Sequence, residues 1–274
     1  MLNGEVYAPL IALLQTSPSR EKVQLFLEQK PLNIYQADPH GYTALMCAIE
    51  NEVGIEIIED LIAREGEKKP KNEYGRSALM VAVNANSSSE TIQALLSKKG
   101  MVNEIDNDGR NALMLGLKSQ QNKTNVHTIL ADPSLNINQI DNNETSTLMH
   151  AILNNADPDI IQMMLQIKDI NINYQNKHDE TALSLAIQQK NMPVVKMLLK
   201  HGATLTPSLL KEIPMDYKMH NLLSKWLSKH EKIGEKRVRL SFSPEIDHPT
   251  VTSKMSMPIA KIKSSGKKPK TQKF

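Results

Sequence analysis

The chain has 274 residues, of which 40% are hydrophobic and 23% are charged, an ordinary composition for one or two soluble domains. A single cysteine, Cys47, excludes an intramolecular disulfide and a zinc site built on cysteines. No segment approaches the run of about 18 apolar residues that a membrane-spanning helix needs. No cleaved signal peptide is expected, because no basic segment precedes the first apolar run.

The net charge of +3 is divided unevenly along the chain. Residues 231–274 carry 11 Lys and Arg against four Asp and Glu, which gives +7 and leaves −4 for residues 1–230. The same segment is rich in Ser, Pro, Lys and Gly and poor in large apolar residues, a composition typical of disorder. The sequence therefore predicts a mildly acidic folded body followed by a basic, disordered tail.

One short pattern recurs through the body at nearly constant spacing. Five full copies superimpose without gaps, with central leucines separated by 34, 34, 35 and 35 residues, and a degenerate copy lies 35 residues before the first. An Asp or Asn stands seven residues before each leucine, and aliphatic residues recur at fixed positions after it. This register indicates a repeat architecture. The central leucines are Leu45, Leu79, Leu113, Leu148 and Leu183.

Each copy predicts a short apolar helix, a polar break, a second amphipathic helix and a turn rich in Asx and Gly. A small residue three positions after each leucine should let neighbouring helices approach closely. Gly41, Gly75 and Gly109, four positions before the leucine, suit a turn with positive φ. Glu144 and Asp179 stand there in the last two copies, so we expect those turns to be more strained or differently shaped.

The segment Asp38-Pro39-His40-Gly41-Tyr42-Thr43-Ala44-Leu45-Met46-Cys47-Ala48 resembles the ankyrin repeat pattern D-x-x-G-x-T-P-L-x-x-A. The family's second signature is similar to Leu198-Leu199-Lys200-His201-Gly202-Ala203, and a Val-Asn or Ile-Asn pair recurs three times. Two positions depart from the family: Ala or Thr replaces its Pro, and Met or Ser replaces the His after the leucine. The resemblance implies an all-α ankyrin-repeat solenoid.

The repeat boundaries give four predicted regions. Residues 1–35 form a degenerate N-terminal capping repeat, 36–205 five ankyrin repeats, 206–230 C-terminal capping helices, and 231–274 the basic disordered tail. Caps are expected because the terminal units of a solenoid must cover an apolar face that no further repeat buries. Trp226 is predicted to plug the last interface.

Motifs for nucleotide, metal or nucleophilic chemistry are absent from the sequence. Cys47 occupies a repeat position that is apolar in most copies, so we interpret it as a packing residue and not as a nucleophile. His150 and His201 are likewise interpreted as structural. Four methionines at one repeat position are interpreted as core, in preference to an adaptable binding strip. No cofactor and no metal are expected.

The function predicted is that of a non-enzymatic protein-interaction module with an unidentified protein partner, acting as a monomer. Ankyrin proteins bind ligands through their hairpin tips and inner helices, and interaction hot spots favour Tyr and Arg. By that resemblance, partner-binding residues are expected on the first three full repeats, and two aromatic and two basic side chains lead the set. The residues are Tyr42, Tyr74, Arg76, Arg110, His40, Glu50, Glu73 and Asp108.

The basic tail leaves two alternatives open. In the first, the protein is a regulator or inhibitor that acts through the tail, where Ser241 and Ser243 are candidate phosphorylation sites. In the second, the less favoured, the repeats are the binding part of an enzyme. The tail suits nuclear import or weak contact with an anionic membrane surface. Specific nucleic-acid binding is disfavoured, because the body is acidic and lacks a set of aromatic rings for stacking.

Lys outnumbers Arg 27 to 6. The recurring Thr-Ala-Leu-Met motif resembles the repeats of ankyrin proteins from intracellular bacteria such as Legionella and Coxiella. Many of those proteins are effectors delivered into host cells. The resemblance implies a type IV secretion effector that binds a host protein. The expected location is cytoplasmic, and for an effector it is the cytoplasm or nucleus of the host cell.

Overall fold

The computed structural model describes residues 9–16, 18–29, 34–119, 122–205 and 217–230. The chain divides into two compact units, Met1–Leu227 and Ser228–Phe274. Only the end of one helix is described in the second unit, so the architecture below is that of the first. The predicted basic tail and residues 206–216 of the predicted C-terminal cap lie outside the described residues.

Helices come in consecutive pairs, as the repeat pattern predicts. The first helices of the pairs are α1 (Pro9–Leu14), α3 (Ala44–Glu50), α5 (Ala78–Asn84), α7 (Ala112–Gly116), α9 (Thr147–Leu153) and α11 (Ala182–Gln188). The second helices are α2 (Arg20–Gln29), α4 (Ile55–Glu65), α6 (Ser89–Leu96), α8 (Lys123–Leu130), α10 (Pro158–Gln166) and α12 (Met192–Lys200). A 3₁₀ turn, η1 (Met101–Asn103), follows α6, and α14 (Tyr217–His230) comes last.

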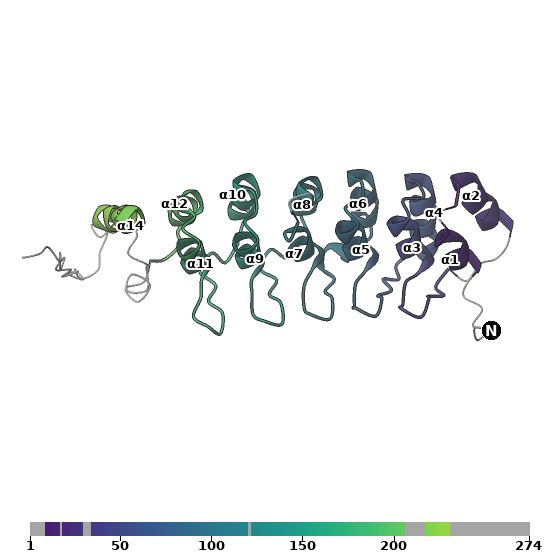
Figure 1. The fold of residues 1–274 in the computed structure, drawn as a ribbon, viewed down its shortest axis with the longest axis horizontal. Helices are drawn as coiled ribbons and strands as arrows, with labels where there is room; N and C mark the ends of the chain where they lie inside the picture. The colour runs from purple at the N-terminus through teal and green to yellow at the C-terminus, as the bar shows by residue number, and fades with distance from the viewer. Residues whose placement is uncertain (1–8, 17, 30–33, 120–121, 206–216, 231–274) are drawn as a thin grey trace, which may run out of the picture. The chain divides into compact units, whose positions relative to one another are not determined.

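The described residues contain no β-strand, and the predicted all-α class is confirmed. Two isolated antiparallel bridges, Ala37–Thr43 and Ile140–Ser146, close hairpin-shaped loops before α3 and α9. We call these loops, one before each of α3, α5, α7, α9 and α11, the hairpins. In Figure 1 they project from the same side of the helix pairs.

The helix pairs stack into two rows (Figure 1). Helices α3, α5, α7, α9 and α11 pack on one another in one row, and α4, α6, α8, α10 and α12 pack in the other. Each second helix also packs on the first helix of its own repeat. The core therefore lies between the rows and continues from repeat to repeat, which is how a solenoid buries apolar surface that one unit alone would expose.

Side-chain caps fix where the first helices begin. The oxygens of Thr43, Asn111, Ser146 and Thr181 each accept a hydrogen bond from the backbone N–H three residues later. Such a bond satisfies one of the donors that every helix N-terminus leaves free. The pattern Thr/Ser/Asn-Ala-Leu-Met therefore encodes a capped helix start followed at once by core residues.

The repeated methionines are core residues. The side chains of Met46, Met80, Met114 and Met149 are all fully buried, which confirms the packing interpretation. The small residue three positions after the central leucine is needed for close packing of the helices. At Gly116 an added Cβ would lie 3.0 Å from the Val126 side chain and 3.2 Å from that of Val83, closer than most side-chain contacts in proteins.

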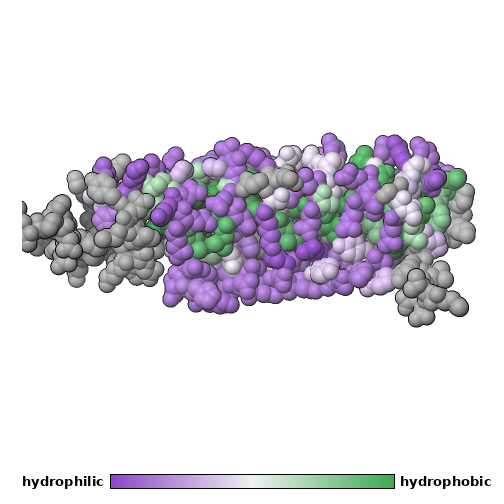
Figure 2. Space-filling model, in the orientation of Figure 1, coloured by the Kyte–Doolittle hydropathy of each residue, from purple (hydrophilic) through white to green (hydrophobic). Residues whose placement is uncertain are grey.

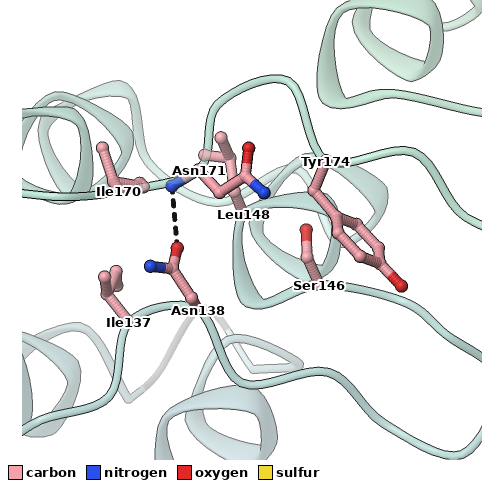
Figure 3. Close-up of a pocket in the computed structure, with 7 residues that line it drawn as sticks. All are labelled: Ile137, Asn138, Ser146, Leu148, Ile170, Asn171 and Tyr174. Atoms are coloured by element: carbon pink, nitrogen blue, oxygen red, sulfur yellow. Dashed lines mark hydrogen bonds between the residues drawn. The ribbon is translucent and has the colours of Figure 1, made fainter.

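Asparagines from the recurring Val/Ile-Asn pair connect consecutive repeats. The Asn138 side-chain oxygen accepts the Asn171 backbone N–H at 2.8 Å, as Figure 3 shows, and its amide donates to the Asp169 carbonyl at 2.8 Å. Asn103 and Asn173 make the equivalent pair of bonds to the segments that follow them. Each asparagine thus satisfies backbone groups of the next repeat, which explains its recurrence.

Residues at both ends of the array are buried against it. Helices α1 and α2 pack on α3 and α4, so the degenerate first copy does form a helix pair. At the other end Met219 and Leu223 of α14 belong to the buried core, whereas Trp226 packs against it and is only partly buried. Trp226 therefore packs against the end of the array as predicted, but Met219 and Leu223 are the more deeply buried residues of α14.

Candidate functional site

The hairpins are ordered by the Asp or Asn that stands seven residues before each central leucine. The Oδ1 atom of Asn72 accepts the backbone N–H groups of Tyr74 and Arg76, both at 3.0 Å. Asp38, Asp106, Asp141 and Asn176 make the same two bonds in their own hairpins. Side chains five and three positions before the leucine are thereby held at fixed places, and these positions carry most of the predicted binding residues.

The residue four positions before the leucine adopts positive φ in all five hairpins. Gly41, Gly75 and Gly109 have φ of 78°, 72° and 78°, and Glu144 and Asp179 have φ of 60° and 59°. The prediction for the glycines is confirmed. The last two hairpins keep the same turn and are not differently shaped, and a left-handed conformation there costs a residue with a Cβ about 1–2 kcal/mol.

Neighbouring hairpins are bonded directly to each other. The backbone N–H of Glu73 donates to the His40 carbonyl at 2.8 Å, and that of Asn107 to the Tyr74 carbonyl at 3.0 Å. Asn142 makes the same bond to Asp108 at 2.9 Å. The tips of the first four hairpins therefore form one continuous edge. Figure 2 shows hydrophilic residues along this edge.

Five of the eight predicted binding residues line one hollow where the N-terminal helix pair meets the first two full repeats. We call this hollow, of about 310 Å³, the tyrosine groove. It contains two aromatic rings and three carboxylates contributed by different repeats. Its lining residues are Gln15, Asp38, His40, Tyr42, Cys47, Glu50, Asn51, Glu73 and Tyr74.

The carboxylates of the tyrosine groove have few cationic partners. Burial raises the pKa of Glu50, and the nearby Asp38 raises it further, while a hydrogen bond from Tyr42 opposes both. Burial and the charge of Glu50 raise the pKa of Tyr42. His40 Nδ1 lies 2.9 Å from Glu73 Oε1, on the exposed rim. The groove thus presents negative charge beside tyrosine rings.

Cys47 lines the same groove but is not suited to nucleophilic chemistry. Its side chain is 3% exposed. Burial, followed by the charges of Asp38 and Glu50, raises the pKa of its thiol to about 12. The thiol is therefore protonated at neutral pH, and a protonated thiol is a poor nucleophile. This agrees with its interpretation as a packing residue.

The other three predicted residues lie beside the groove, on the second and third hairpins. The Arg76 guanidinium carbon lies 5.4 Å from the centre of the Tyr74 ring. Arg110 is paired with buried Asp106, at 2.9 Å, and with exposed Asp108. The structure thus brings the eight residues together on three neighbouring hairpins and α3.

Lys118, directly after α7, belongs to the same surface and was missed by the sequence interpretation. Burial lowers the pKa of Lys118, the positive charges of Arg110 and Arg76 lower it further, and the carboxylates of Asp106 and Asp108 oppose that effect. The signal was present, because Lys118 stands five residues after Leu113, the repeat position that Glu50 occupies in the first full copy.

His150 has a partner that the repeat pattern did not reveal. Its Nε2 lies 3.0 Å from Asp141 Oδ2, and His150, in the middle of α9, is 8% exposed. Burial lowers the pKa of His150, and the Asp141 carboxylate opposes that effect. This confirms a structural role for His150. Ser241 and Ser243 lie outside the described residues.

Other chemistry has little support in the part of the chain that the structure describes. The cavity lined by Ile137, Asn138 and Tyr174 (Figure 3) has a volume of about 20 Å³, room for about one water molecule. Within the described ranges no three His, Cys, Asp or Glu side chains are grouped to hold a metal ion. Nor is any described helix long and apolar enough to cross a membrane.

A profile of the family described as ankyrin repeats (3 copies) matches residues 51–141 and 119–208, more than half of the chain. The chain belongs to the ankyrin repeat family. Ankyrin repeats are protein–protein interaction modules, so the family supports a binding role in general terms. No sequence among the curated proteins matches this ankyrin-repeat chain.

Solved structures agree with the ankyrin assignment. An ankyrin repeat domain from Acinetobacter baumannii is 23% identical, with a TM-score of 0.62, over 72% of this chain and 98% of that one. The ankyrin repeat domain of Bcl-3, of the IkappaB protein family, is 22% identical with a TM-score of 0.63, over 79% and 97%. A chain from the complex of a predatory endopeptidase of Bdellovibrio bacteriovorus with an immunity protein is 23% identical with a TM-score of 0.58, over 70% and 96%. At these identities the likeness establishes the fold.

Proposed function

We propose that this protein is a non-enzymatic interaction module that binds a protein partner through the hairpins and inner helices of its first three full repeats. The observation that carries the proposal is the tyrosine groove together with the Arg76, Arg110 and Lys118 side chains beside it. Rings and charged groups held on a rigid scaffold lose little conformational entropy on binding, which favours their use as recognition residues.

A non-enzymatic role is supported by the chemistry of the groove. Its one nucleophile candidate, Cys47, has a pKa raised to about 12. His40, the histidine that lines the groove, lies on its exposed rim and pairs with Glu73. Solvent surrounds this pair, whereas a catalytic histidine usually lies in a partly buried site. These groups suit recognition better than proton transfer or covalent catalysis.

The decisive experiment compares partner capture by three forms of the full chain. Wild-type protein, the double variant Tyr74→Ala/Arg76→Ala and the control Lys168→Glu are used to retrieve proteins from lysate, with quantitation by mass spectrometry. Lys168 is exposed and lies after α10, away from the groove. We expect the double variant to lose a partner at least tenfold and the control to keep it. Equal capture by all three forms would contradict the surface assignment.

A finer proposal is that the module is a bacterial effector acting in the host cytoplasm or nucleus as a monomer, with the basic tail as address or regulator. Its support is compositional: the excess of Lys over Arg and the net charge of +7 on residues 231–274. Fusion of those residues to a reporter tests delivery into host cells, and removal of the tail tests whether it is required. Replacing Ser241 and Ser243 with Ala tests regulation by phosphorylation.

A further inference from the structure

The predicted binding positions change their charge from one repeat to the next. The positions three before and five after the central leucine carry Tyr42 and Glu50 in the first full repeat, but Arg110 and Lys118 in the third. None of the other four full copies combines a ring with a carboxylate at these two positions. The tyrosine groove, which both Tyr42 and Glu50 line, therefore has a chemistry that the other repeats do not share.

Two of the three carboxylates that line the tyrosine groove lack a cationic partner. Among the described residues neither Asp38 nor Glu50 forms an ion pair, whereas Glu73 lies 2.9 Å from His40 Nδ1 on the exposed rim. Asp38 Oδ1 accepts two N–H groups of its own hairpin, and Oδ2 accepts only from the neutral amide of Gln15, at 3.4 Å. The negative charge of the groove is therefore left for a ligand to neutralise.

The rest of the lining consists of rings and a thiol. Tyr74 is 51% exposed, an unusual position for a large ring, and Tyr42 packs against the core and is only partly buried. Cys47 also lines the groove although it is 3% exposed, and its thiol has no hydrogen-bond partner among the described residues. The faces of tyrosine rings attract cations, and a neutral sulfur is a weak hydrogen-bond acceptor. These groups, like the carboxylates, favour a cation that also has flat or apolar surface.

One cation of the chain shows how such a ligand is held. Arg76 is not among the lining residues, and its guanidinium carbon lies 5.4 Å from the centre of the Tyr74 ring. No described cation has an equivalent contact with the Tyr42 ring. The volume of the groove, about 310 Å³, lies at the lower end of the range of about 300–1,000 Å³ typical of ligand sites, so it suits one long side chain.

We propose that the tyrosine groove binds an arginine side chain of the protein partner, with the guanidinium paired to Glu50 and Asp38 and stacked on Tyr42. This inference rests on the proposed function and names the chemistry of the partner at one place. A guanidinium is planar, donates to two carboxylate oxygens at once and stacks on a ring, whereas the ammonium of Lys is a compact and strongly hydrated charge. Arg110 and Lys118 further along the array repel a run of positive charges, which favours a single arginine over a polybasic segment.

The test uses three blocked pentapeptides, each with one central residue between glycines: Arg, Lys, or citrulline, which has nearly the shape of Arg but no charge. Binding to the full chain is followed by NMR at the ring signals of Tyr42 and Tyr74, which separates this groove from other acidic surface. We expect saturable shifts with the Arg peptide, shifts at least fivefold smaller with citrulline, and at least threefold weaker binding of the Lys peptide. Equal shifts with Arg and citrulline, or equal affinity for Arg and Lys, would overturn the arginine assignment.

Glu50→Lys is the most informative variant, because Lys118 occupies the equivalent position in the third full repeat and the fold accepts it there. The new ammonium should replace the ligand's charge, so the Arg peptide should bind at least tenfold more weakly. Glu50→Gln, which keeps the shape of the side chain, should weaken binding at least threefold. Glu59→Gln, at an exposed residue of α4 outside the groove, is the matched control and should leave binding unchanged.

Undiminished binding of the Arg peptide to Glu50→Lys would overturn the proposal. The site and the proposed function can fail separately. Absence of peptide binding, alongside loss of partner capture by Tyr74→Ala/Arg76→Ala, would reject the arginine site and leave the proposed function standing.

Discussion

The first three hairpins and the last two share one backbone design but differ at the tip. Gly41, Gly75 and Gly109 allow the next hairpin to approach, and each is followed by a direct hydrogen bond to its neighbour. No backbone hydrogen bond of this kind joins the tip of the fourth hairpin, which carries Glu144, to the described residues of the fifth hairpin. Glycine is therefore used here for close contact between repeats as well as for positive φ.

The contact distances explain this difference. A Cβ at Gly75 would lie 2.7 Å from the Asn107 backbone nitrogen, and one at Gly109 would lie 2.9 Å from that of Asn142. A side chain at either position would push the next hairpin away. The first hairpins thus gain a continuous edge and display Tyr and Arg on it, whereas the last hairpins carry Thr145 and Glu180 at the position of Tyr42, Arg76 and Arg110.

Charge contacts between repeats also favour the N-terminal region, and removing one should have the largest effect on stability. Lys98 Nζ donates to Glu65 Oε2 at 2.8 Å and to the Lys68 carbonyl at 2.8 Å, all within the interface of the first two full repeats. Lys98→Met leaves Glu65 buried without its cation and should cost about 3–5 kcal/mol. Urea unfolding followed by circular dichroism measures this loss, and Lys99→Met, at an exposed neighbour, should change little.

The need for glycine at the tips of the first three hairpins can be tested directly. Gly75→Ala places a Cβ at φ 72° and against Asn107, so we expect a loss of about 2–4 kcal/mol and weaker bonding between the second and third hairpins. The same unfolding assay measures the loss. Hydrogen exchange at the Asn107 amide should be faster. An unchanged exchange rate would show that the hairpin edge tolerates a side chain.

The reverse substitution tests the second region. Glu144→Gly removes a left-handed residue with a Cβ and should stabilise the protein by up to about 1 kcal/mol. Asn143→Ala, at the same tip but without a left-handed backbone, is the matched control. A loss of stability in Glu144→Gly would mean that the Glu144 side chain contributes a contact that outweighs its strain.

The smallest expected effect concerns pH. Burial lowers the pKa of His150 below its ordinary value of 6.5, so the unfolded chain takes up a proton before the folded chain does as the pH falls. His150 therefore favours the folded state above pH 6.5, and this advantage is lost as the pH falls from 6.5 toward the lowered value.

His150→Leu places at this position the residue that Leu115 and Leu185 provide in other repeats. The variant should lose less stability than the wild type between pH 7 and pH 5, by no more than about 3 °C in Tm. His178→Asn, at an exposed hairpin tip, should keep the wild-type pH dependence. Parallel slopes for wild type and His150→Leu would remove His150 as the cause.

The sequence alone determined the helix pairs, the methionine core and the positive φ of the glycines at the hairpin tips. These features depend on local spacing and on the apolar pattern, which repeat five times and are therefore easy to recognise. The candidate binding residues were also predictable, because their repeat positions lie on the hairpins and Tyr and Arg stood out among them. Lys118 could have been predicted in the same way, because it occupies the repeat position of Glu50.

Only the tertiary structure decided which side chains meet across repeats. Glu65 and Lys98 are separated by 33 residues, and the tyrosine groove combines residues from Gln15 to Tyr74. The pairing of Asp141 with His150 depends on which side chain the following helix places within hydrogen-bond distance. Repeat periodicity shows which positions are equivalent. Which side chain each of these positions contacts in the next repeat depends on how the particular side chains pack.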